Sequence, residues 1–148
     1  ASAQLSAALG KPQEEARALN QLAYLAWQHR LYAEAERFAN AALLLVDDMS
    51  LEKAMSLSAL GLVATEQSRY IDAEKYHQEA LLVRTHHAAE KEMAWSLQNL
   101  GLTLRDQGRP RVAVEYFKQA LTLLDKTQDP ARSRAYVRSP ITLILPSC

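Results

Sequence analysis

The chain has 148 residues, and its 17 lysine and arginine residues are balanced by 17 aspartate and glutamate residues. Binding to nucleic acid or to an anionic membrane surface through charge needs a clustered positive surplus, so this balance argues against both as the main partner. The length suits one domain with its own core. With 4 glycines and 5 prolines, and with few β-branched residues before the C-terminal tail, the composition favours helix throughout.

Cysteine and apolar segments bear on the cellular compartment. Cys148 is the single cysteine, which excludes an internal disulfide and gives no sign of secretion. The first ten residues, ASAQLSAALG, lack the basic start and apolar run of a signal peptide. The longest apolar run, ITLIL at 141–145, is too short to span a bilayer. We therefore expect a cytoplasmic protein, and the missing initiator methionine suggests a processed or excised piece.

After a short flanking helix expected at 2–9, the chain repeats itself. The segments at 18–31, 56–69 and 96–109 read ALNQLAYLAWQHRL, SLSALGLVATEQSR and SLQNLGLTLRDQGR, at offsets of 38 and 40. A second shared segment begins at 32, 70 and 110: YAEAERFANAAL, YIDAEKYHQEAL and PRVAVEYFKQAL. The unit is thus a pair of helices, repeated three times at about 16–49, 54–88 and 94–127. Self-similarity at this period indicates a helical solenoid.

Apolar residues recur at helical spacing in every copy. In the first helices we expect a buried stripe that includes Leu19, Leu22 and Ala26, then Leu57, Leu60 and Ala64, then Leu97, Leu100 and Leu104. In the second helices the expected stripe includes Ala35, Phe38 and Ala42, then Ala73, Tyr76 and Ala80, then Ala113, Tyr116 and Ala120. Gly61 and Gly101 lie in mid-helix, where glycine costs about 1 kcal/mol relative to alanine. We expect the missing Cβ to let the paired helix approach closely.

The helix boundaries carry the usual signals. Gly108 predicts a helix end in the left-handed conformation, and Pro110 suits the first turn of the next helix. Arg30 and Ser68 stand at or near the corresponding turns of the first two repeats. Ser50 precedes LEKAM and is expected to cap a helix N-terminus.

The chain ends in a partial helix and an apolar tail, 131–148. The segment ARSRAYVR begins like another first helix, and Ser139-Pro140 then stops it. Three alternatives stay open for residues 139–148: the tail folds over the last repeat, pairs with a second copy to give a homodimer, or is left disordered by truncation.

The order of these features resembles the tetratricopeptide repeat. The Leu-small pair of that family appears as Leu60-Gly61 and Leu100-Gly101, and its Tyr-x-Glu-Ala motif as residues 32–35. The usual unit has about 34 residues. The longer unit here is similar to the long repeats of kinesin light chain, of peptide-binding polarity scaffolds and of helical sensor domains in bacterial regulators. The resemblance implies an all-α, right-handed α-solenoid and a protein-interaction role.

In that family the first helices line the concave side. The resemblance therefore implies a peptide-binding groove made of Arg17, Asn20, Gln21, Tyr24, Trp27, Met55, Leu62, Trp95, Gln98, Asn99, Leu102 and Arg105. It places Gln28, Ser58, Ala59, Thr65, Glu66 and Asp106 on the same face. Aromatic anchors would supply burial, and amides would pair with a peptide backbone. Asn99 resembles the first-helix asparagine that holds peptide backbones in long-repeat scaffolds.

Catalytic and metal-binding motifs are missing from the sequence. It has no glycine-rich phosphate loop and no GxSxG, and His86 and His87 would point about 100° apart on a helix. We expect His29, His77, His86 and His87 to be solvated turn residues, and no metal, cofactor or enzyme activity. The leading prediction is a peptide- or helix-binding module within a larger scaffold or regulator. The alternative is a segment of a bacterial regulator that senses a small effector or forms oligomers.

Overall fold

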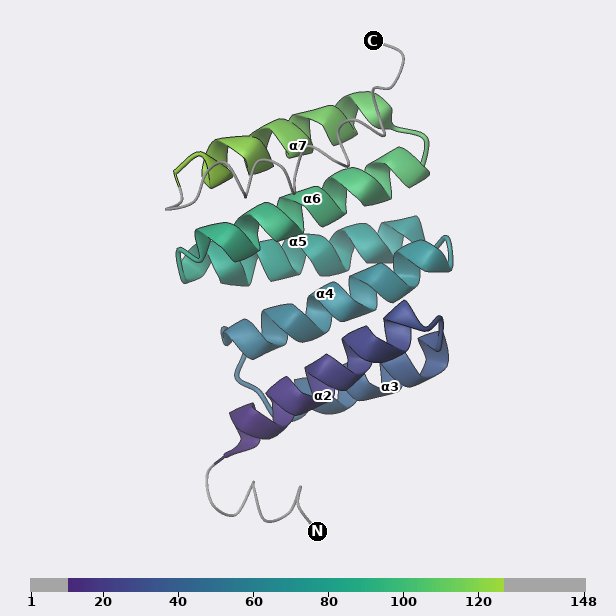
Figure 1. Ribbon diagram of the computed structural model, residues 1–148, viewed down its shortest axis with the longest axis vertical. Helices are drawn as coiled ribbons and strands as arrows, with labels where there is room; N and C mark the ends of the chain where they lie inside the picture. The colour runs from purple at the N-terminus through teal and green to yellow at the C-terminus, as the bar shows by residue number, and fades with distance from the viewer. Residues whose placement is uncertain (1–10, 127–148) are drawn as a thin grey trace.

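The computed structural model describes residues 11–126, and this part of the chain is built of helices without any strand. The helices are α2 (Pro12–Gln28), α3 (Tyr32–Leu43), α4 (Leu51–Glu66), α5 (Tyr70–His86), α6 (Glu90–Asp106) and α7 (Pro110–Leu124). They pack most extensively as the pairs α2–α3, α4–α5 and α6–α7. Figure 1 shows them stacked in chain order along the long axis of the molecule. The predicted all-α solenoid is confirmed, whereas segments 2–9 and 131–148 lie outside the described residues.

Each tight turn between paired helices has the same backbone geometry. Arg30, Ser68 and Gly108 all adopt positive φ, at 63°, 61° and 84°. The residue that follows each of them donates its N–H to a carbonyl five residues back, as Leu31 does to Ala26 at 2.8 Å. This is the hydrogen bond that ends a helix through a left-handed residue. The prediction for Gly108 is therefore confirmed, and the first two repeats make the same turn without glycine.

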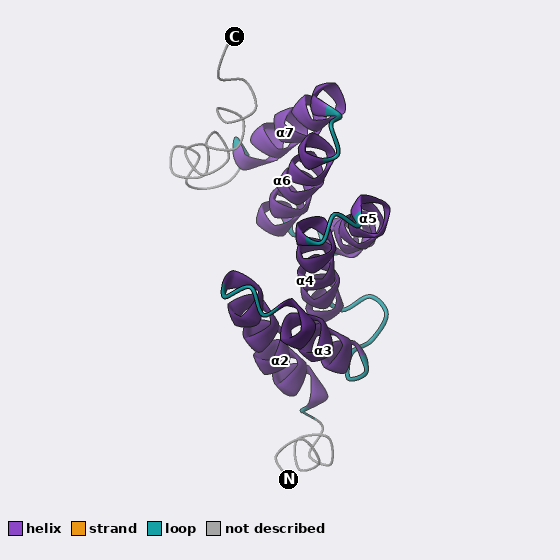
Figure 2. Ribbon diagram, turned by 90° about the vertical axis from the view of Figure 1, so that its right-hand side faces the viewer, coloured by secondary structure: helices purple, strands orange, loops and turns teal. Residues whose placement is uncertain are grey.

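The connection from α3 to α4 is the longest in the described chain, and it loops outward in Figure 2. It ends at Ser50, whose side chain accepts a hydrogen bond from the Lys53 backbone N–H at 3.1 Å. The predicted N-cap is thus confirmed, and it fixes the point where α4 begins.

The core is a series of small clusters between successive helices. Helix α4 contacts α2, α3, α5 and α6, so its residues 56–61 are all buried. The first-helix stripe was predicted correctly in the second and third repeats, but Leu22 is 42% exposed. No described helix precedes α2, so nothing in residues 11–126 covers the side of α2 that carries Leu22.

The second-helix stripe was predicted correctly at its six alanine positions, which are all fully buried, but its large middle member is displaced by one residue in each repeat. Phe38, Tyr76 and Tyr116 are half-buried and pack at the edge of the clusters. The fully buried positions are the next ones along the chain, Ala39, His77 and Phe117. Both neighbours of each pair lie on the inward half of the helix, so periodicity alone does not show which of them is fully buried.

The mid-helix glycines make room for a ring of the paired helix. A Cβ at Gly61 would lie 2.5 Å from the His77 ring, and a Cβ at Gly101 would lie 2.8 Å from the Phe117 ring. The expected close approach of the paired helix is thus made by a ring of that helix, which lies on the glycine. His77 is therefore a fully buried core residue and not a solvated one.

Candidate functional site

A pocket of about 380 Å³ opens on the face formed by α2, α4 and α6. It is lined by Tyr24, Trp27 and Gln28 of α2, by Leu62, Thr65 and Glu66 of α4, and by Trp95, Gln98, Asn99, Leu102, Thr103, Arg105 and Asp106 of α6. Helix α4 therefore forms the floor, and its two neighbours form the walls. Eight residues of the predicted groove lie together in this pocket: Tyr24, Trp27, Leu62, Trp95, Gln98, Asn99, Leu102 and Arg105.

Two aromatic rings bound one end of the pocket. Tyr24 comes from α2 and Trp95 from α6, and their centroids are 5.6 Å apart with the planes tilted by 47°. Since α4 lies between these helices in the stack, the two rings meet across the floor. The Tyr24 hydroxyl is fixed by a hydrogen bond of 3.1 Å to the Met55 carbonyl. The wide face of the solenoid is thus narrowed to a pocket with a closed end.

A buried arginine lies directly behind that end. The Arg84 side chain rises from α5 and is 1% exposed. Its guanidinium donates to the hydroxyls of Ser58 at 2.7 Å and Ser96 at 2.6 Å, and its carbon lies 5.0 Å from the centre of the Trp95 ring. Burial lowers the pKa of Arg84 and raises the pKa of the neighbouring Tyr24 hydroxyl. The arginine therefore connects α5 to α4 and α6 by hydrogen bonds, and its guanidinium packs against the Trp95 ring.

Three polar atoms of the pocket have no hydrogen-bond partner within residues 11–126. They are the Trp27 indole Nε1, the Gln98 Oε1 and the Asn99 Nδ2. Gln98 is 7% exposed and Asn99 is 4% exposed, so both amides pay a desolvation cost that nothing in the described chain offsets. The residues that line the pocket thus hold two donors and one acceptor that the described chain leaves unpaired.

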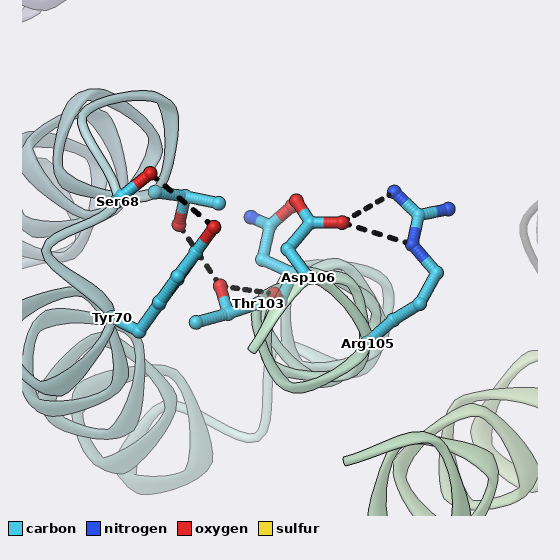
Figure 3. Close-up of polar contacts among 7 residues, drawn as sticks. Ser68, Tyr70, Thr103, Arg105 and Asp106 are labelled. Atoms are coloured by element: carbon cyan, nitrogen blue, oxygen red, sulfur yellow. Dashed lines mark hydrogen bonds and ion pairs between the residues drawn. The ribbon is translucent and has the colours of Figure 1, made fainter. Parts of the chain in front are cut away.

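Charged and hydroxyl groups at the opposite end are already paired. Arg105 forms an ion pair with the next residue, Asp106, at 3.0 Å, as Figure 3 shows. The Thr103 hydroxyl lies 3.0 Å from the hydroxyl of Thr65. Glu66 accepts a longer hydrogen bond of 3.4 Å from the Tyr32 hydroxyl. This end of the pocket carries two carboxylates against one arginine.

Four residues of the predicted groove do not line the pocket. Asn20 is buried, and its amide is consumed by the Glu52 carbonyl at 3.0 Å and by the Ser56 hydroxyl at 2.8 Å. Arg17 forms an ion pair with Glu52 at 3.0 Å, Gln21 is exposed, and Met55 lies beneath the Tyr24 hydroxyl. Arg17 and Asn20 thus lie at the contact between α2 and α4, which corrects the expectation that Asn20 is left free to line the groove.

Sequence reasoning missed Thr103 and Arg84. For Arg84 a signal was present, because the equivalent positions of the other repeats are Val46 and Leu124. An arginine at a register position that is otherwise apolar marks a candidate buried charge, which is rare in proteins. Thr103 gave no such signal, since threonine is ordinary on either face of a helix.

Among residues 11–126, no group of three or more histidine, cysteine or acidic side chains could hold a metal ion. None of the helices from α2 to α7 is long and apolar enough to cross a membrane. His29, His86 and His87 are exposed at helix ends, as expected.

A comparison with known protein families shows to which family the chain belongs. The tetratricopeptide repeat model matches residues 52–126, about half of the chain. The chain belongs to the tetratricopeptide repeat family. Repeats of this family are non-catalytic modules that mediate contacts between proteins. No curated protein matches the sequence.

Among solved structures, the tetratricopeptide chain is similar to the N-terminal domain of stress-induced protein-1 (STI-1) from C. elegans. The sequence identity is 16%, the TM-score is 0.63, and the match covers 86% of this chain and 97% of that one. At this identity the likeness shows the fold alone.

Proposed function

We propose that this tetratricopeptide segment is a peptide-binding module of a larger scaffold or regulator, and that the pocket between α2 and α6 holds an extended peptide. The observation that carries the proposal is the pair of unfilled amides on α6. Gln98 presents an acceptor and Asn99 presents a donor, and the two residues are adjacent. A peptide unit offers one N–H and one C=O, which is the matching set. The role proposed for Asn99 agrees with the resemblance to long-repeat scaffolds.

The size of the pocket limits the length of the peptide. Ser58 lies beside Arg84 at the closed end, and Glu66 lies at the far end of the floor on the same helix. Eight residues of helix rise about 12 Å. An extended chain advances about 3.3 Å per residue, so the pocket takes three or four residues. A short linear segment therefore suits the site better than a full amphipathic helix.

Apolar contacts would supply most of the affinity. Trp27, Leu62, Trp95 and Leu102 are half-buried around the pocket and become more buried when it fills. Each 100 Å² of apolar surface removed from water contributes about 2.5 kcal/mol before the ordering cost of the peptide is subtracted. One large apolar side chain in the peptide would make this gain.

A small effector is the second candidate, and the volume of the pocket favours it. About 380 Å³ lies within the range of sites for small molecules, and the ring contact closes one end. Self-association through residues 139–148 stays a prediction, because that segment lies outside the described residues. The cytoplasmic location stays a prediction as well.

Intrinsic tryptophan fluorescence can report ligand binding to the pocket. Its two tryptophans, Trp27 and Trp95, both line the pocket, so all tryptophan emission comes from the site. We would select ligands from a random seven-residue peptide display library, synthesise the enriched sequences and titrate them against the intrinsic fluorescence. A panel of small metabolites in the same assay tests the second candidate.

Matched variants localise the signal. Leu62→Glu places a charge on the floor of the pocket, and Leu82→Glu makes the same change at a position of α5 that is 63% exposed and away from the pocket. We expect the first to weaken peptide binding at least ten-fold and the second to leave it unchanged, with both folded by circular dichroism. Equal binding by all three proteins, or no enriched peptide at all, would contradict the proposed function.

A further inference from the structure

Arg84 is the one lysine or arginine among the described residues that is buried, and its contacts are all neutral. They are the two serine hydroxyls, the Met55 sulfur at 3.6 Å and the face of Trp95. The ion pairs found within residues 11–126 do not include it. Burial lowers the pKa of Arg84, and the charge of Glu92 partly offsets this without forming an ion pair. A charge taken out of water without a contacting counter-charge is costly, and the equivalent positions in the other repeats are apolar. Packing therefore gives no reason for an arginine here.

The charge lies where an occupant of the pocket would feel it. Trp95 contacts Arg84 on one side and lines the pocket, and Tyr24 interacts with the guanidinium and lines the pocket as well. The cation thus lies against two rings that also line the pocket. Aromatic rings exclude water, so the attraction for an anion on their far side is weakly screened.

The other arginines near the pocket are already paired with carboxylates, so they do not attract an anionic ligand as Arg84 does. Arg105 is paired with Asp106 at 3.0 Å, and Arg17 with Glu52 at 3.0 Å. At the far end Glu66 and Asp106 would repel a carboxylate. The pocket is thus polarised, positive at the Tyr24–Trp95 end and negative at the Glu66 end.

We propose that the pocket selects a peptide with an acidic side chain, whose carboxylate seats against the Tyr24–Trp95 end and is held there by the buried charge of Arg84. This inference rests on the proposed function and adds the chemistry of the ligand and its direction. The source is a side chain and not the chain terminus, because the unfilled donor and acceptor of Asn99 and Gln98 suit a backbone that continues along α6. Arg84 acts through the two rings and is therefore a specificity-determining residue.

The test is a double-mutant cycle on the peptides selected above, with the library displayed both with a free and with an amidated C-terminus. Each enriched Asp or Glu is changed to Asn or Gln in the peptide. In the protein, Arg84→Met removes the charge, and Arg84→Gln removes it while keeping donors for Ser58 and Ser96 in case the methionine variant does not fold. Arg105→Met is the control, since it removes a charge at the other end.

We expect an acidic residue at one fixed position in both library formats. Changing it to its amide should weaken binding to the wild type and to Arg105→Met roughly ten-fold, and should leave binding to the Arg84 variants almost unchanged. Enriched peptides without an acid, peptides bound only through a free C-terminus, or an equal loss in the Arg84 variants would overturn this inference while peptide binding stands. If no peptide is enriched at all, both this inference and the proposed peptide-binding function would be contradicted.

Discussion

The imidazole ring of His77 lies against the α-carbon of Gly61, so close that a Cβ at Gly61 would be 2.5 Å from the ring. Phe117 has the same relationship to Gly101, at 2.8 Å. In the first repeat the two positions are Ala23 and Ala39, which share one cluster with Leu60. A ring on the second helix thus requires glycine on the first helix. In the first repeat, an alanine methyl group on each helix fills the same space.

Gly101→Ala should therefore destabilise the protein despite the higher helix propensity of alanine. Propensity alone would contribute about 1 kcal/mol in favour of the change. Overpacking against Phe117 costs typically 1–3 kcal/mol, and we expect a net loss of up to about 2 kcal/mol in urea denaturation. In a Phe117→Ala background, which recreates the pair of the first repeat, Gly101→Ala should instead be neutral or stabilising. Equal effects in both backgrounds would show that the ring does not select the glycine.

His77→Phe should stabilise the protein and remove part of its acid sensitivity. Both ring nitrogens of His77 are buried without a partner within the described residues, and burial lowers its pKa to about 3, with the charge of Arg84 adding to the effect. Because the unfolded chain binds this proton below pH 6.5 and the folded chain does not, stability falls as pH drops from about 6.5 toward 3. The slope contributed by His77 approaches about 1.4 kcal/mol per pH unit.

The measurement is the free energy of unfolding of both proteins between pH 7 and pH 4. We expect His77→Phe to gain about 1–2 kcal/mol at pH 7, where the wild-type histidine is neutral but unpaired, and to gain more at pH 4. His29→Phe, a change at an exposed histidine, is the control and should leave the pH dependence as it is. Parallel curves for the wild type and His77→Phe would contradict the assignment of His77 as a neutral core residue.

Arg84→Met should leave the protein as stable as the wild type or make it more stable by about 1 kcal/mol. A methionine fills much of the same volume and removes a buried charge that no carboxylate contacts. Arg84→Ala should lose about 2–4 kcal/mol, since it leaves a cavity between α4, α5 and α6. Thermal unfolding of the two variants separates the destabilising effect of the buried charge from the stabilising effect of side-chain packing. A large loss in Arg84→Met would indicate that the two serine contacts stabilise the fold more than the charge disfavours it.

Glycine should be favourable at the left-handed turns that lack it. Ser68→Gly and Arg30→Gly each remove the steric penalty of a side chain at positive φ, and we expect gains of about 0.5–1 kcal/mol per site. The reverse change, Gly108→Ala, should cost about 1 kcal/mol. Ser68→Ala keeps the penalty and serves as the control, with an expected change near zero. The readout is the shift of the urea midpoint at a constant slope.

The repeated pattern determined the helices, their order and the solenoid, because each pair of amphipathic helices can bury its apolar face only against the next pair. Local signals determined the cap at Ser50 and the turn at Gly108, because both features depend only on residues that are close in sequence. The helix faces that bear Trp27, Trp95 and Asn99 followed from the periodicity of 3.6 residues and the resemblance to the family.

Tertiary structure alone decided which of those faces became a pocket. Tyr24 and Trp95 are 71 positions apart in the sequence, and only the curvature of the stack brings their rings together across α4. The same curvature buries Arg84 behind them and turns Asn20 into a contact between helices. Periodicity specifies the direction in which a side chain leaves its own helix, whereas a site depends on the distances between helices, and these are set by how all the side chains between them pack.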